Sequence, residues 1–221
     1  MEKISAWNGR GPSKRDLEAF MAELEKGTKL LSRRDPAIRV LAKKHGLPEI
    51  RPHGGYFATL VRSIIFQQIS GAAGESIMKK TLVVLGGMLD PTIITQVPDE
   101  PLRGAGLSPQ KLGYLRSLCQ HVLDGRLELP RLPKLSDEEV IRELTDVKGI
   151  GVWTAHMFLM FSLGRLDVLP TGDLGVRRGV QHAYALDTMP TPKQVEAIVQ
   201  EKNWAPYRSI GSWYMWRVVD N

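Results

Sequence analysis

The stretch Leu144-Thr-Asp-Val-Lys-Gly-Ile-Gly-Val-Trp-Thr-Ala155, near the middle of the 221-residue chain, carries two glycines separated by one residue. Shortly before it, Ser136-Asp-Glu-Glu139 forms a capping box, in which the serine and glutamate side chains satisfy backbone amides at the start of a helix. Glycine readily adopts the left-handed backbone that ends a helix, so we expect this helix to end at Lys148-Gly149. A second helix should begin after Gly151. The stretch therefore predicts a helical hairpin.

The glycines of this hairpin can have two purposes. They leave backbone N–H groups uncovered at the N-terminus of the second helix, where the helix dipole is positive, and such a position binds phosphate. Alternatively, they serve only the geometry of the turn, which is the usual explanation of an isolated Gly-x-Gly. The complete pattern Leu-x-x-Val-x-Gly-Ile-Gly-x-x-Thr-Ala favours phosphate binding.

Helical spacing also dominates the remaining chain. Apolar residues recur every three or four positions behind Ser13, a predicted N-cap, and again after residue 55. These residues are Leu17, Phe20, Met21 and Leu24 in the first segment and Phe57, Leu60, Val61, Ile64 and Ile65 in the second. No alternating strand pattern is visible, so we predict an all-α protein.

Composition narrows the function classes. The net charge of +6 and the pI of about 9.5 favour a polyanionic partner. Cys119 is the only cysteine, which excludes an internal disulfide, a cysteine zinc site and an iron–sulfur cluster, and favours a reducing intracellular setting. The longest apolar stretch, residues 152–163, is too short to span a bilayer. We expect a soluble protein that does not bind a membrane.

The hairpin resembles the helix-hairpin-helix of the HhH-GPD superfamily of DNA glycosylases, and Leu169-Pro-Thr-Gly-Asp173 is similar to its Gly/Pro-rich loop and aspartate. Three further segments are similar to the 3-methyladenine DNA glycosylase II (AlkA-type) branch: Ile65-Phe-Gln-Gln-Ile-Ser70, Gly106-Leu-Ser-Pro-Gln-Lys-Leu-Gly-Tyr-Leu115, and Pro206-Tyr-Arg-Ser209 with Trp216. The resemblance runs from about Tyr56 to Trp216.

This resemblance implies two helical domains, one of residues 56–166 with the hairpin and one formed by residues 1–55 and 167–221, with the active-site cleft between them. It implies a monomeric enzyme that excises 3-methyladenine and 7-methylguanine from double-stranded DNA and so initiates base excision repair. We expect it in the bacterial cytoplasm, at the nucleoid, or in a nucleus. Trp153 occupies the position of the lysine with which some members cut the strand, which implies a monofunctional glycosylase.

Asp173 is the predicted catalytic residue, because it occupies the position of the superfamily's essential carboxylate. Breaking a glycosidic bond places positive charge on the sugar, and a nearby anion lowers that barrier. Without the resemblance, an aspartate before the run Val176, Val180 and Tyr184 indicates only a helix cap.

The family pattern also implies how the base is held outside the duplex. Gln68 corresponds to the residue that fills the gap left by the base, and Gln67 supports it, although two glutamines at a helix end are ordinarily solvated. Electron-rich rings suit a cationic base. Trp216 and Trp153 are the principal pocket candidates, and Phe57 and Trp213 are weaker ones, because aromatic residues at helical spacing are more often core.

Two backbone anchors are implied. The hairpin contributes Lys148, Gly149, Gly151 and Thr154, and the second anchor consists of Gly106, Ser108 as an N-cap and Lys111. Superfamily hairpins can also bind Na⁺ or K⁺ through loop carbonyls, which here belong to Thr145, Val147 and Ile150. We expect no other cofactor and no side-chain metal site.

Two other functions stay open on the sequence alone. A glycosylase with this fold can act on deaminated or etheno-modified bases instead of alkylated purines. A DNA-binding protein without catalytic activity can use the same hairpin to hold phosphate, with Asp173 as a cap only.

Overall fold

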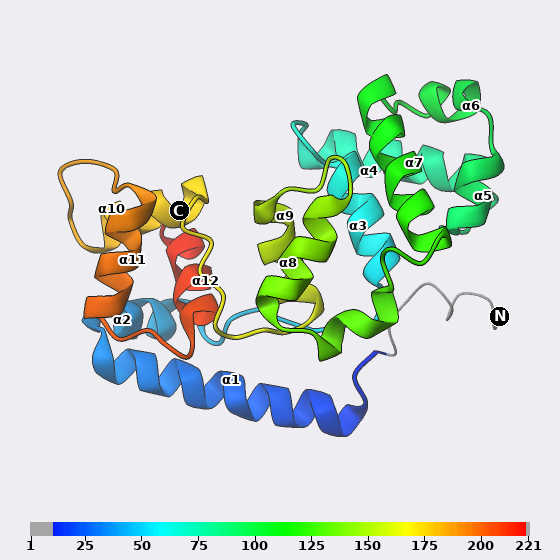
Figure 1. Cartoon of the computed structure of the whole chain (residues 1–221). Helices are drawn as coiled ribbons and strands as arrows, with labels where there is room; N and C mark the ends of the chain where they lie inside the picture. The colour runs from blue at the N-terminus through cyan, green and yellow to red at the C-terminus, as the bar shows by residue number, and fades with distance from the viewer. Residues whose placement is uncertain (1–10, 220–221) are drawn as a thin grey trace. The chain divides into compact units, whose positions relative to one another are not determined.

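The computed structural model describes residues 11–219, and these form helices joined by loops, with no strand (Figure 1). The predicted all-α class is confirmed. The first ten residues of the predicted N-terminal segment lie outside the described residues. The described chain separates into two compact units, one made of Gly11 and residues 53–158, the other of residues 12–52 and 159–219. No helix within residues 11–219 is long and apolar enough to cross a membrane.

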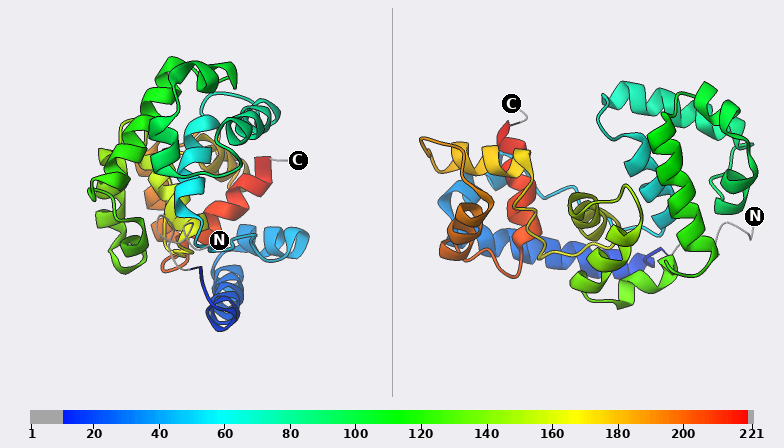
Figure 2. Two further views of the ribbon diagram at one scale, coloured as in Figure 1. Left: turned by 90° about the vertical axis from the view of Figure 1, so that its right-hand side faces the viewer. Right: turned by 45° about the horizontal axis from the view of Figure 1, so that its top comes forward.

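The first unit is built around one long helix, α7, which packs against α3, α5 and α6. Its buried side comes from Leu112, Leu115 and Leu118, which recur at helical spacing. The helices of this unit are α3 (Tyr56–Ile65), α4 (Gly71–Val84), α5 (Pro91–Gln96), α6 (Asp99–Gly104), α7 (Pro109–Leu123), the 3₁₀ helix η2 (Leu129–Lys134), α8 (Asp137–Asp146) and α9 (Val152–Met157) (Figure 2).

The second unit packs helices from both ends of the chain around α12. Its elements are α1 (Lys14–Arg34), α2 (Pro36–His45), the π-helical turn η3 (Phe158–Ser162), which begins at the boundary, α10 (Leu174–Ala183), α11 (Pro192–Glu201) and α12 (Arg208–Val219). Asp35 is fully buried in this unit, where its carboxylate accepts hydrogen bonds from the Tyr184 hydroxyl and, at 2.8 Å, from the Trp204 indole.

Local sequence signals fix the helix starts. Ser13, Ser108 and Ser136 are N-caps of α1, α7 and α8, as predicted, and the Ser136–Glu139 capping box is present. The second helix of the hairpin begins after Gly151, as expected, but its α-helical part is only six residues long because it continues as η3.

We predict that Gly179→Ala destabilises the protein. A Cβ atom at Gly179 would lie 2.2 Å from the backbone oxygen of Met215, so α10 and α12 would have to separate. Overpacking of this kind typically lowers the free energy of unfolding by about 1–3 kcal/mol. Urea unfolding measures the change. Gly113→Ala is the control, since Gly113 lies inside α7 and a Cβ atom added there would have no neighbour within 4 Å, and it should be neutral or stabilising. An equal effect of both variants would contradict the close approach.

Candidate active site

Asp173 is held by two donors at one of its oxygens. It is the N-cap of α10, and its Oδ1 atom accepts the Val176 amide at 2.7 Å. The same oxygen accepts the indole N–H of Trp216, on α12, at 2.8 Å. The side chain is 9% exposed. Asp173 is therefore a helix cap, as its local sequence indicates, and also the partner of an aromatic residue 43 positions away.

Two residues that sequence reasoning missed complete this contact. The ring of Phe161 lies 5.9 Å from that of Trp216, at an interplanar angle of 31°. Gly175 leaves room for the indole, because a Cβ atom there would lie 2.7 Å from Trp216 Cδ1 and 3.1 Å from Asp173 Oδ1. A glycine in the first turn of a helix was the only signal for Gly175, and nothing in the sequence links Phe161 to Trp216.

The other predicted pocket residues have different surroundings. Trp153 lies in the first turn of α9 and is 53% exposed. Phe57 is 1% exposed in the core of the first unit. Trp213 is 5% exposed and packs edge-on against Tyr214, with the Arg217 guanidinium over its ring. Trp216 is the predicted pocket residue whose hydrogen bond to the Asp173 carboxylate is described above.

The structure requires glycine at one of the two hairpin positions but not at the other. Gly149 has a φ of 90°, and a Cβ atom there would lie 2.2 Å from the ring of Tyr114, so both the turn and its packing need glycine. Gly151, the N-cap of α9, has a φ of −99° and no atom within 4 Å of a Cβ position. Packing does not require glycine at position 151. A side chain at this position would meet open space.

The other residues predicted for the hairpin occupy different environments. Lys148 is exposed, and its backbone amide donates to Ser117 Oγ at 3.2 Å. Thr154 is 8% exposed. The Val147 carbonyl, one of the three predicted cation ligands, accepts the Ile150 amide at 3.0 Å. Among residues 11–219, no group of three or more acidic, histidine or cysteine side chains can hold a metal ion.

The predicted second anchor lies at the start of α7. Gly106 has a φ of 108° and Ser108 accepts the Lys111 amide at 3.2 Å, as a cap should. The Lys111 ammonium donates to the Ile65 carbonyl, at the end of α3, at 2.7 Å. Burial lowers the pKa of Lys111. This ammonium therefore has a partner within the protein.

The predicted wedge residues follow α3 directly. Gln67 donates from Nε2 to the Gly149 carbonyl at 2.8 Å, which joins this turn to the hairpin. Gln68 is exposed and has a φ of 56°, a left-handed conformation that is uncommon outside glycine.

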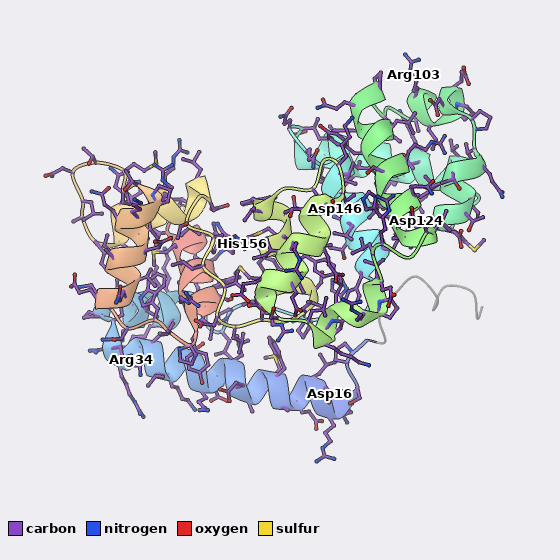
Figure 3. The ribbon with its side chains drawn as sticks, in the orientation of Figure 1. Asp16, Arg34, Arg103, Asp124, Asp146 and His156 are labelled. Carbon is purple, nitrogen blue, oxygen red and sulfur yellow. The ribbon has the colours of Figure 1, made fainter. Side chains whose placement is uncertain are left out.

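A contact at the C-terminal end of α8 also joins the hairpin to α7. Asp146, labelled in Figure 3, lies 3.3 Å from Nε2 of His121, on α7. The Nδ1 atom of His121 lies 2.7 Å from the Ser117 carbonyl. His156, also labelled there, belongs to α9, and burial lowers the pKa of its imidazole.

Comparison with known proteins identifies the family of this chain. The family model described as HhH-GPD superfamily base excision DNA repair protein matches residues 61–206. DNA-3-methyladenine glycosylase 1 of Schizosaccharomyces pombe is 33% identical over 164 residues, which cover 73% of this chain and 71% of that protein.

Solved structures show the same relationship. A DNA-3-methyladenine glycosidase from Bacillus halodurans is 37% identical, with a TM-score of 0.78 over 86% of this chain and 88% of its own. The S. pombe 3-methyladenine DNA glycosylase in complex with abasic DNA is 31% identical, with a TM-score of 0.75 over 87% of this chain and 95% of its own. The chain therefore belongs to the HhH-GPD superfamily of base excision DNA repair proteins.

Proposed function

We propose that this protein is a DNA-3-methyladenine glycosylase, which hydrolyses the N-glycosidic bond of 3-methyladenine and 7-methylguanine in duplex DNA and initiates base excision repair. Relatives in S. pombe and B. halodurans are named as a DNA-3-methyladenine glycosylase and a DNA-3-methyladenine glycosidase. The observation that carries the proposal is the buried Asp173 carboxylate, fixed by the Trp216 indole and the Val176 amide. It would act as a monomer wherever the DNA is, in a bacterial cytoplasm or a nucleus.

Asp173 would act chiefly as a fixed negative charge. An alkylated purine is already cationic and leaves without a proton, so the barrier lies in the positive charge that develops on the deoxyribose. A carboxylate whose orientation is set before the reaction stabilises that charge without reorganising. It can also orient the attacking water. The abasic site would remain uncut, because Trp153 stands where a lysine would be needed for a Schiff base.

The extruded base would be bound by aromatic faces. Trp216 and its neighbour Phe161 would supply such a surface, since electron-rich rings attract a cationic base. The exposed Trp153 is a further candidate for stacking on the base. Phe57 and Trp213 are weaker candidates, because protein atoms already cover them. Gln68 would enter the gap left in the duplex, where its amide can hydrogen-bond the orphaned base.

Phosphate groups would be held at two places. A Cβ atom at Gly151, the N-cap of α9, would meet open space, and Lys148, Gly149 and Thr154 are its neighbours in sequence that would help to hold a phosphate. Gly106 and Ser108 at the start of α7 form the second place. A Na⁺ or K⁺ ion on the carbonyls of Thr145, Val147 and Ile150 would add positive charge beside the hairpin.

Base release tests the proposal. Duplex DNA alkylated with a methylating agent should yield free 3-methyladenine and 7-methylguanine, detected by chromatography, and the strand should break only after alkali treatment. Parallel release assays on duplexes that contain hypoxanthine or ethenoadenine measure which modified bases the protein excises. Release of only those bases would replace the alkylated-purine assignment. Binding to abasic DNA with no base released from any duplex would show a DNA-binding protein without glycosylase activity.

A further inference from the structure

The turn that carries Gln68 has an uncommon backbone. Gln68 follows α3 with a φ of 56°, and its side chain is exposed. A non-glycine residue keeps a left-handed conformation only when the surrounding structure holds it. The contacts that hold this turn therefore decide where the Gln68 amide points.

Besides the backbone hydrogen bonds at the end of α3, two side-chain hydrogen bonds hold the turn, one on each side of residue 66. The Lys111 ammonium donates to the Ile65 carbonyl at 2.7 Å and so satisfies a carbonyl at the end of α3. The Gln67 amide donates to the Gly149 carbonyl, in the hairpin, at 2.8 Å. The hairpin and the turn are 82 residues apart in sequence and are joined directly.

The same face of α7 also supports the hairpin. The Tyr114 ring packs against Gly149, and the Gln110 amide bonds the Tyr114 hydroxyl at 2.6 Å. Ser117 Oγ accepts the Lys148 amide at 3.2 Å. Residues 110, 111, 114 and 117 are spaced as one side of a helix. We call them the α7 brace.

We propose that Lys111 is a positioning residue for base extrusion, and that the α7 brace keeps Gln68 at a fixed place relative to the phosphate-binding hairpin. The proposal rests on the proposed function, because it takes Gln68 as the residue that fills the gap in the duplex. With the brace intact, binding of the hairpin to phosphate brings the Gln68 amide to the same base step each time. Lys111 then acts through Gln68 and does not itself contact the DNA.

Lys111→Met tests this, since it keeps the side-chain length and removes the ammonium. The protein binds a duplex with a tetrahydrofuran abasic-site analogue opposite 2-aminopurine, whose fluorescence reports how the orphaned base is contacted. Affinity is measured at several salt concentrations on the same duplex and on an undamaged one. Lys148→Met is the comparison for a phosphate contact, and Lys80→Met, an exposed lysine on α4, is the neutral control.

We expect Lys111→Met and Gln68→Ala to alter the 2-aminopurine signal alike and to slow base release by about 10- to 100-fold, as a misplaced group does. For Lys111→Met, the slope of log affinity against log salt concentration should equal that of wild type. For Lys148→Met, the magnitude of this slope should fall by about 1. Gln67→Leu removes the other hydrogen bond of the turn. Its effect should combine non-additively with that of Lys111→Met.

A salt slope lowered by about 1 in Lys111→Met would overturn the proposal in favour of a direct phosphate contact. An unchanged fluorescence signal in a folded Lys111→Met protein, confirmed by the same result for Gln67→Leu, would overturn it as well. These readouts use DNA that has no base to release. They therefore separate failure of the α7 brace from failure of the glycosylase assignment, which the wild-type release assay reports.

Discussion

Replacing Asp173 with asparagine is expected to slow the release of 3-methyladenine and 7-methylguanine about a thousandfold. A carboxylate about 4 Å from the positive charge on the sugar contributes about 4 kcal/mol at an effective dielectric constant of about 20. About 1.4 kcal/mol corresponds to a tenfold rate change, so the loss amounts to about three orders of magnitude. Single-turnover release under saturating enzyme measures the chemical step without a contribution from product release.

The fold should survive this substitution. Asparagine is as good an N-cap as aspartate, and its side-chain oxygen can accept the Val176 amide and the Trp216 indole that Asp173 Oδ1 now accepts. Affinity for an abasic duplex should therefore change little. Asp90→Asn is the matched control, since Asp90 is the N-cap of α5. Release by Asp173→Asn within about threefold of wild type would leave Asp173 a cap only, since loss of a catalytic charge costs far more.

The helical framework could be predicted because its signals are local. Ser13, Ser108 and Ser136 each lie within three residues of the amides that they cap, so the sequence alone identifies them. The π-helical end of the hairpin's second helix could not be predicted, because the stretch 152–162 is largely apolar and offers no stop signal.

The contacts around the candidate site escaped prediction because they join distant segments. The sequence predicts that Trp216 faces the base, but its hydrogen bond to Asp173 depends on how α10 and α12 pack. The family resemblance likewise implies that Lys111, in the first turn of the helix that Ser108 caps, contacts a phosphate. Its partner in the structure, Ile65, lies 46 residues away. Such pairings come from tertiary packing, which residue spacing does not encode.

Trp216→Phe should lower the rate of base release about 10- to 100-fold while leaving DNA affinity nearly unchanged. Phenylalanine keeps an aromatic ring beside Phe161 but removes the N–H that donates to Asp173 Oδ1. A hydrogen bond to a charged group contributes about 1.5–3 kcal/mol, which corresponds to one or two orders of magnitude in rate. Single-turnover release and Kd for abasic DNA separate the orientation of Asp173 from stacking on the base.

Trp204→Phe is the matched control for this prediction. It removes an indole–carboxylate hydrogen bond of the same length, 2.8 Å, from Trp204 to Asp35, inside the core of the second unit. That variant should unfold at a lower urea concentration but release bases at the wild-type rate.

Gly175→Ala disturbs the Trp216 contact independently, since its Cβ atom would lie 2.7 Å from the indole. Both changes act on the hydrogen bond from Trp216 to Asp173. The double variant should therefore release bases only slightly more slowly than Trp216→Phe alone. Fully additive rate losses would show that Trp216 acts by stacking on the base and does not orient Asp173.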